Sequence, residues 1–474
     1  MSSTTQARAR IDSLLDAGSF VEIGARVKAR ATDFNLKQTD TPSDGVVTGY
    51  GVLNGRLVYV YAQDSKVLGG SVGEMHAKKI AGLYDMALKM GAPVIGLIDS
   101  AGLRLEESTD ALNGFGEIYL KQSLASGVIP QITAVFGNCG GGLACLSALS
   151  DFTFIEEKNG KIFVNSPNAI EGNYAGKCDT SAADFQGEAG NVDVACDEAS
   201  IYASIRELVD LLPSNNSDLA LVDCEDDLNR ASANVDRTAG DAMIALADIA
   251  DDNYVFETGR MCAKEIVTAF IRLNGATVGC VANRSAVIGE DGEVAEDLGT
   301  AISARGALKA AEFVKFCDAF EIPVLTLTDV TGYKACKCGE KNMARNMAKM
   351  IGAFASATVP KVNVYTGKAY GSAYIAMNSK AIGADITIAW PDAEIGCMDA
   401  SAAAKILGSD KSADEQSKIA ADYKALQNNV NSAAARGYVD EIVEPADTRK
   451  YIIGAFEMLA NKSVEGPVRK HGTV

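Results

Sequence analysis

The pattern of apolar and polar positions occurs twice along the chain. In each half, an apolar stretch with strand composition precedes a stretch with helical periodicity, and a continuous apolar run then follows directly after a proline. Continuous apolar runs are typical of strands that are buried on both faces. The strand-like stretches lie at 57–61 and 276–281, and the helical stretches lie at 74–90 and 304–320. The apolar runs after a proline lie at 94–98 and 324–327.

Matching segments give the spacing of the two copies. Segment 93–99 resembles 323–329, which lies 230 positions later, whereas 53–55 resembles 273–275 at a spacing of 220 positions. The ten additional residues fit an acidic, glycine-rich insertion at 289–292. Because strands alternate with helices in both halves, the sequence predicts an α/β fold built from two copies of one unit.

A polar, acidic segment at 212–218 separates the two copies. Segments of this composition between periodic stretches are typical of linkers. We therefore expect two domains, at 1–225 and 226–474. From residue 410 onward the pattern is helical, with apolar positions at Ile419, Tyr423, Leu426 and Val430.

A turn of small residues follows a buried strand at the same place in each copy. The first N–H groups of a helix have no partner within the helix, and the helix dipole favours negative charge there. Such a turn can stabilise a developing oxyanion, although a duplicated fold would also duplicate a turn needed only for packing. The residues are Gly141, Gly142 and Leu143 in the first copy and Gly371, Ser372 and Ala373 in the second.

Composition restricts the class of protein. The formal net charge is −18, which argues against nucleic acid or an anionic membrane as a partner. An odd number of cysteines, 11, scattered without framework spacing, indicates reduced thiols. Neither a signal peptide nor a membrane-spanning apolar run is present, so we expect a cytoplasmic protein. The chain has only two histidines, His76 and His471, so a histidine-based mechanism has few candidates.

Ordered blocks of sequence over about residues 6–408 resemble the carboxyltransferase β subunit of propionyl-CoA and acetyl-CoA carboxylases. One block, Gly69-Gly70-Ser71 followed by Glu74, His76-Ala77 and Lys79-Ile80, is similar to the family's Gly-Gly-Ser…Glu-x-His-Ala-x-Lys-Ile. The other blocks are 59–64, 91–97, 99–104, 126–132, 139–142, 148–154, 305–307, 316–320, 357–362, 368–371 and 389–395.

The resemblance implies two tandem crotonase-like domains of ββα superhelix type, with coenzyme A bound by the first and biotin by the second. It implies that residues 141–143 hold the acyl thioester oxygen and that residues 371–373 polarise the carboxyl group or ureido oxygen of carboxybiotin. Carboxyl transfer needs an enolate, charge stabilisation and proximity but no protein nucleophile, which agrees with the few histidines.

The resemblance also implies partners and substrates. A homo-oligomer built from dimers, with sites between chains and a hexamer as its expected form, would receive carboxybiotin from a biotin carboxyl carrier protein. This chain has no carrier lysine motif and no ATP-grasp domain, so a biotin carboxylase or a membrane decarboxylase subunit must be separate. A short acyl-CoA, propionyl-CoA with methylmalonyl-CoA, is favoured, and a glutaconyl-CoA decarboxylase subunit is an alternative.

Six further residues are candidates for cofactor contacts. Arg8 and Arg10 resemble the family's N-terminal segment that contacts coenzyme A, and Lys66 and Arg104 are candidates by position. Ile375 stands where relatives that favour short acyl chains often carry an aspartate, and Arg345 keeps a basic position of the family. The sequence departs from the family at 183–195 and after Val330, where Thr331-Gly332-Tyr333 replaces Pro-Gly-Phe.

Three alternatives arise on sequence grounds. Segment 69–73 matches the G-x-S-x-G nucleophile elbow, so Ser71 defines a serine hydrolase hypothesis. Cys336 and Cys338 suggest a metal, but zinc needs four ligands and no histidine or second cysteine pair is close in sequence, so we predict no metal site. A noncatalytic protein that only binds coenzyme A is the third alternative.

Overall fold

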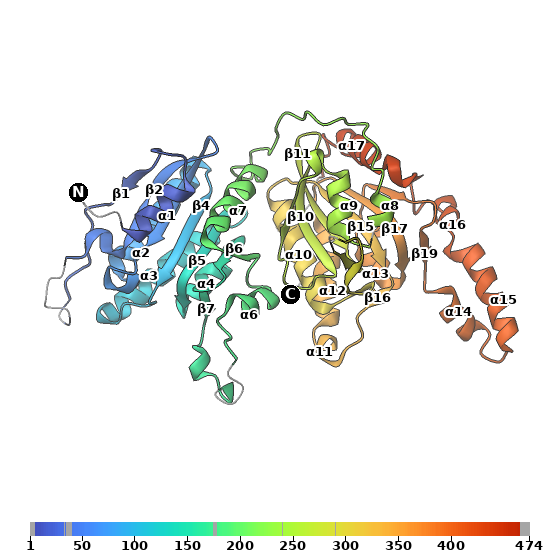
Figure 1. Cartoon of the computed structure of the whole chain (residues 1–474), viewed down its shortest axis with the longest axis horizontal. Helices are drawn as coiled ribbons and strands as arrows, with labels where there is room; N and C mark the ends of the chain where they lie inside the picture. The colour runs from blue at the N-terminus through green and yellow to red at the C-terminus, as the bar shows by residue number, and fades with distance from the viewer. Residues whose placement is uncertain are drawn as a thin grey trace. The chain divides into compact units, whose positions relative to one another are not determined.

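The computed structural model of the chain describes residues 5–32, 34, 40–173, 178–238, 240–289 and 291–464. The chain divides into two compact units between Ala220 and Leu221, and each is described by itself (Figure 1). No helix within these residues combines the length and apolar character that crossing a membrane requires.

The first unit is a mixed sheet covered by helices. Strand order is β1-β2-β3-β4-β5-β6-β8, with β7 paired to β5; β1, β2 and β3 are antiparallel and the later pairs are parallel. The strands are β1 Val21–Ile23, β2 Val46–Leu53, β3 Arg56–Gln63, β4 Val94–Ser100, β5 Gln131–Gly140, β6 Phe152–Glu156, β7 Lys161–Phe163 and β8 Val194–Cys196. The helices are α1 Gln6–Leu14, α2 Glu74–Met90, α3 Ser108–Ala125, α4 Gly142–Ala148, α6 Ala183–Glu188 and α7 Glu198–Leu211.

The core of this unit follows from the apolar pattern. On β3, Tyr59 and Tyr61 belong to the apolar cluster under α2 and α3, while the alternate residues Val58 and Val60 are also fully buried. Helix α1 lies beside α7 (Figure 1). Helix α2 ends at Gly91, whose φ of 61° is the left-handed conformation that glycine adopts without strain.

The second unit has the same strand order, β9-β10-β11-β15-β17-β18-β20, with β19 paired to β17. Two short pairs, β12–β13 and β14–β16, lie outside the main sheet. The strands are β9 Val255–Thr258, β10 Ile266–Leu273, β11 Ala276–Asn283, β12 Ala286–Ile288, β13 Val294–Asp297, β14 Ala301–Ile302, β15 Val324–Val330, β16 Gly332–Tyr333, β17 Lys361–Tyr370, β18 Ile386–Ala389, β19 Glu394–Gly396 and β20 Glu441–Ile442. The helices are α8 Val235–Thr238, α9 Ala242–Ile249, α10 Ala304–Ala319, α11 Lys337–Glu340, α12 Met343–Ser356, α13 Gly371–Ala376, α14 Ala400–Leu407, α15 Ala413–Tyr423, α16 Val430–Ala435 and α17 Thr448–Met458.

Strand register relates the two units residue by residue. Tyr59 on β3 pairs with Val94 on β4, and Gly279 on β11 pairs with Val324 on β15. The β4–β5 and β15–β17 pairs have the same register at equivalent positions. Each contains a register shift, between residues 98 and 100 in the first pair and between residues 328 and 330 in the second. The spacings of 220 and 230 positions are those predicted from the sequence, and the β12–β13 hairpin contains the predicted insertion.

The predicted elements agree with the observed ones in most positions. Helix α2 has the predicted bounds, and α10 ends one residue before the predicted end. The tail is helical, as predicted: a π-helical turn at Lys424–Asn428 links α15 to α16. Of the apolar positions predicted in the tail, Val430 is buried, whereas Leu426 is 68% exposed.

Candidate functional site

The first glycine turn lies between β5 and α4. Gly141 has φ of 60° and ψ of −121°, a conformation that side-chain-bearing residues rarely adopt. Its N–H donates to the carbonyl oxygen of Phe163 on β7 at 2.8 Å. Gly141 therefore shapes the turn, and its N–H group is already bonded within the fold. Gly142 and Leu143 are the first residues of α4, where the helix provides no carbonyl partner.

Tyr119 on α3 holds this turn in place, and sequence reasoning missed it. Its hydroxyl donates to the Gly142 carbonyl oxygen at 2.7 Å. A Cβ built on Gly142 would lie 2.8 Å from the same hydroxyl, so the turn passes too close to Tyr119 for a larger residue. Burial raises the pKa of Tyr119 to about 12, so the hydroxyl remains a neutral donor.

The second turn, between β17 and α13, also begins with a glycine of positive φ. Gly371 has φ of 61°, and Gly371, Ser372 and Ala373 open the helix. Ser372 is exposed and Ala373 is buried. Below the turn, the Asn363 side chain donates to the carbonyl oxygens of Met377 and Asn378, both at 2.9 Å. This buried contact fixes the end of α13, and no sequence motif indicated it.

Tyr333 approaches the second turn from β16. Its hydroxyl is buried and has no hydrogen-bond partner among the described residues. Burial raises the pKa of Tyr333, and the neighbouring Ser372 hydroxyl lowers it by a smaller amount. A buried hydroxyl beside the exposed Ser372 side chain can hydrogen-bond a ligand at this turn. Tyr333 is thus a site candidate that the sequence did not single out.

An aspartate ends the corresponding strand beside each turn. Cβ atoms built on Gly137 and Gly367 would lie 2.2 and 2.6 Å from the carboxylates of Asp99 and Asp329, so both positions require glycine. Asp329 accepts the N–H of Lys368 at 2.8 Å, and burial raises its pKa. The matching aspartates show that the surroundings of the turns, and not only the turns, are duplicated.

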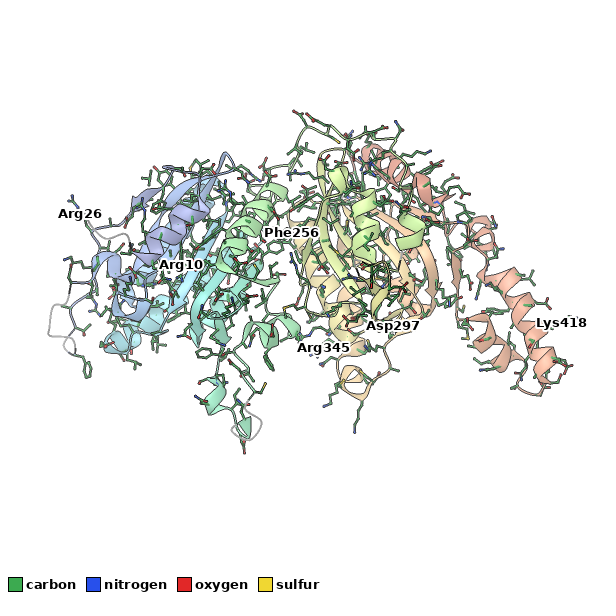
Figure 2. The ribbon with its side chains drawn as sticks, viewed as in Figure 1. Arg10, Arg26, Phe256, Asp297, Arg345 and Lys418 are labelled. Atoms are coloured by element: carbon green, nitrogen blue, oxygen red, sulfur yellow. The ribbon has the colours of Figure 1, made fainter. Side chains whose placement is uncertain are left out.

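Two of the predicted cations are engaged in buried ion pairs. The Arg104 guanidinium, 2% exposed, lies 2.6 Å from Asp44 Oδ1 and 2.8 Å from Glu107 Oε1. Arg10 (Figure 2) is 4% exposed, with Nη1 at 3.1 Å from Asp99 Oδ2 and the guanidinium over the Phe136 ring. Both side chains are engaged within the fold, so a direct contact with coenzyme A would have to compete with these ion pairs.

The other predicted contacts are accessible to different degrees. Lys66 is exposed in the segment after β3. Arg8 is half-buried, pairs with Asp12 at 3.1 Å and lies over the Phe20 ring. In the second unit, Arg345 is exposed on α12 (Figure 2) and Ile375 is half-buried on α13, two residues after Ala373.

The geometry contradicts the serine hydrolase hypothesis. The Ser71 hydroxyl donates to the Leu68 carbonyl oxygen at 2.7 Å and lies 3.3 Å from Arg104 Nε. His76 is fully buried, and its ring nitrogens contact the Asp44 carbonyl oxygen and the Gln63 side chain. Burial, aided by the charge of Arg104, lowers the pKa of His76 to about 3. A base bonded elsewhere cannot activate Ser71. The other histidine, His471, lies outside the described residues.

The chain is similar to known carboxyl transferases over its whole length. The model of the carboxyl transferase domain matches residues 3–474. The propionyl-CoA carboxylase beta chain of Roseobacter denitrificans is 41% identical, over 99% of this chain and 93% of that protein. The methylmalonyl-CoA decarboxylase subunit alpha of Propionigenium modestum is 39% identical, over 99% and 92%.

A solved structure supports the same relationship. A crystal structure of transcarboxylase 12S, described as a hexamer assembly with hydrolysed methylmalonyl-coenzyme A bound, has a TM-score of 0.91 and 36% identity, over 98% of this chain and 92% of that one. The mixed α/β fold of the two units is therefore the carboxyltransferase fold of that enzyme. On sequence, fold and the paired glycine turns together, the chain belongs to the carboxyl transferase domain family.

Proposed function

We propose that the chain is the carboxyltransferase component of a biotin-dependent acyl-CoA carboxylase or decarboxylase. Two equivalent turns carry this proposal: Gly141 and Gly371 have φ of 60° and 61°, each turn opens a helix, and the two lie 230 positions apart. Transfer of a carboxyl group has two oxygens that need stabilisation, the enolate oxygen of the thioester and an oxygen on the biotin side. Two matching turns fit that need.

The first turn suits the thioester. The N–H groups of Gly142 and Leu143 are free of the helix, whereas Gly141 serves only to shape the turn. These two donors would stabilise the oxygen as negative charge develops at the α-carbon. Tyr119 bonds to the Gly142 carbonyl oxygen and so fixes the peptide plane that aims the Leu143 N–H.

The second turn suits biotin. Its N–H groups, from Gly371 to Ala373, open α13, and the unpaired Tyr333 hydroxyl lies next to Ser372. These groups fit a ureido or carboxylate oxygen, which accepts hydrogen bonds and donates none. Biotin on a separate carrier supplies the carboxyl group, and these residues would bind and orient it. Each unit would then be one crotonase-like copy, with domains close to 1–225 and 226–474.

The cation set for coenzyme A is smaller than the sequence suggested. Lys66 is exposed and is the best placed of the four candidates to meet a phosphate, and Arg8 can contribute if it leaves Asp12. Arg10 and Arg104 would act indirectly, by holding Asp99 and the segment around Ser71 in position. Arg345, exposed on α12, would serve the biotin side.

Assembly and partners follow the relatives. We propose a dimer-based homo-oligomer, a hexamer as in the structural neighbour, that works with a biotin carboxyl carrier protein and either a biotin carboxylase or a membrane decarboxylase subunit. Both a carboxylase and a decarboxylase subunit are among the relatives, so the partner subunit would determine whether the acyl-CoA is carboxylated or decarboxylated. The substrate would be a short acyl-CoA, propionyl-CoA or methylmalonyl-CoA, with Ile375 beside the pocket floor.

Kinetics with free biotin test the assignment of the two units. Lys66→Ala should raise KM for the acyl-CoA and leave KM for biotin unchanged, whereas Arg345→Ala should do the reverse. Ile375→Asp should change the ratio of kcat/KM between acetyl-CoA and propionyl-CoA. Equal effects of Lys66→Ala and Arg345→Ala on both KM values would contradict the division, and an unchanged ratio would remove Ile375 from the acyl pocket.

A further inference from the structure

Two cysteines that follow β16 form a close, exposed pair. The Sγ atoms of Cys336 and Cys338 lie 3.4 Å apart, and both side chains are exposed. The Gly339 N–H donates to Cys336 Sγ at 3.2 Å, which caps the short helix α11. Within the described residues no third histidine, cysteine or carboxylate joins them, so the pair is not part of a metal cluster there.

The surroundings of the pair favour a thiolate. Lys334, Lys337 and Lys341 flank the two cysteines and are all exposed. Contact with the Cys338 thiol lowers the pKa of Cys336, and the Gly339 N–H and the charge of Lys334 lower it further. Positive charge also attracts anionic reagents. The three lysines form a local cluster of positive charge on a chain whose net charge is −18.

We propose that Cys336 and Cys338 form a thiol–disulfide exchange site for low-molecular-weight, anionic disulfides such as glutathione disulfide. The Cys336 thiolate attacks one sulfur of the disulfide, a new S–S bond forms, and the first glutathione leaves as its thiolate. The Cys338 thiolate then attacks Cys336 Sγ and releases the second glutathione. Two protein thiols are oxidised to one disulfide, and one glutathione disulfide is reduced to two thiols.

The position of the pair gives the reaction a structural consequence. A disulfide between residues 336 and 338 would remove the thiolate that accepts the Gly339 N–H, so α11 would lose its cap. Tyr333 lies three residues before Cys336, on a strand held to β14 by the Lys334 N–H and the Ile302 carbonyl oxygen at 2.8 Å. The exchange chemistry rests on the thiols alone and does not depend on the proposed function of the chain.

The first test equilibrates the whole protein, in its native assembly, with glutathione buffers of increasing oxidised fraction. After rapid alkylation, peptide mass spectrometry would find residues 336 and 338 joined, with the loss of two hydrogens, in a single two-electron transition. Cys178 and Cys397 are exposed cysteines without a close second thiol among the described residues and serve as internal controls. Separate glutathione adducts on Cys336 and Cys338, or oxidation no easier than at Cys178, would overturn the proposal.

Two conservative variants test the order of attack. Cys338→Ser should trap glutathione on Cys336, because no second thiol can release it. Cys336→Ser should slow alkylation of Cys338, whereas in the unmodified chain Cys336 should react at least about threefold faster than Cys178. Far-ultraviolet circular dichroism confirms that both variants fold. Loss of the adduct in Cys338→Ser, or equal alkylation rates for Cys336 and Cys178, would refute the assignment of Cys336 as the attacking thiol.

Discussion

The Tyr119 hydroxyl donates to the Gly142 carbonyl oxygen across 2.7 Å, and the same hydroxyl occupies the space that a side chain at residue 142 would need. One residue on α3 therefore both positions the first turn and requires glycine in it. Because the peptide group that carries the Gly142 carbonyl also carries the Leu143 N–H, this single contact sets the direction of one proposed donor.

Two replacements of Gly142 distinguish the loss of its N–H donor from the steric effect of an added side chain. Gly142→Pro removes the donor, and proline is tolerated sterically by the backbone at the first position of a helix. Gly142→Ala keeps the donor and brings a Cβ to the same 2.8 Å contact with Tyr119. We expect the proline variant to lose about 10²- to 10³-fold in kcat, the scale for one lost oxyanion donor, and the alanine variant to lose much less.

The double variants with Tyr119→Phe, which removes the clashing hydroxyl, serve as controls for this comparison. They should restore part of the activity of Gly142→Ala but none of the activity that Gly142→Pro loses. If Gly142→Pro and Gly142→Ala lose the same fraction of kcat while circular dichroism is unchanged, the steric effect of a side chain, and not the N–H group, would account for the loss.

Tyr333→Phe should lower catalysis without lowering stability. A buried hydroxyl without a partner does not stabilise the fold, so the melting temperature should stay the same or rise. If the hydroxyl bonds a ligand at the second turn, kcat/KM for biotin should fall about two- to tenfold, the size of one hydrogen bond. Tyr61→Phe is the matched control, because Tyr61 also has a buried hydroxyl without a partner; a similar kinetic loss there would rule out a specific role.

Arg104 and Lys66 should differ in what their removal changes. Arg104→Met leaves Asp44 and Glu107 buried without their cation, and the free energy of unfolding should fall by about 3–5 kcal/mol. Lys66→Met should leave stability unchanged and raise KM for the acyl-CoA about two- to fivefold, an effect that added salt should reduce. Urea titration and steady-state kinetics measure the two quantities, and a stable Arg104→Met with weakened acyl-CoA binding would restore Arg104 to the coenzyme A site.

His76 should make the fold depend on pH. Burial lowers its pKa from 6.5 to about 3, so between these values the unfolded chain binds a proton that the folded chain does not. The stability from neutral His76 is fully present above about pH 6.5 and is lost at roughly 1.4 kcal/mol per pH unit as the pH falls toward 3. The difference in unfolding free energy between the wild type and His76→Gln should therefore narrow from pH 7 to pH 5, and a constant difference would contradict this account.

Periodicity predicted the duplicated fold because it depends on local burial. The buried strands β4 and β15 were visible as continuous apolar runs, and the glycine turns were found after the next strands, β5 and β17, where each strand joins a helix. The spacing of 230 positions then aligned Gly141 with Gly371, and both glycines have a positive φ, of 60° and 61°.

Contacts between distant residues were beyond the reach of that reasoning. Arg104 and Asp44 are 60 positions apart, and Arg10 and Asp99 are 89 apart, so the sequence did not indicate these two buried ion pairs. The bond of the Gly141 N–H group to the Phe163 carbonyl oxygen was not indicated either, because Phe163 lies on β7, 22 positions later in the chain. Long-range pairing of this kind decides which groups remain free for a ligand.

Transfer of a labelled carboxyl group tests the central claim most directly. The protein is mixed with methylmalonyl-CoA labelled in its free carboxyl group and with free biotin, and the products are separated. The account predicts labelled carboxybiotin and intact propionyl-CoA in equal amounts, with no free coenzyme A thiol, and the same result in Ser71→Ala. Release of free coenzyme A thiol without labelled biotin, abolished by Ser71→Ala, would show that the chain is a thioester hydrolase and not a carboxyltransferase.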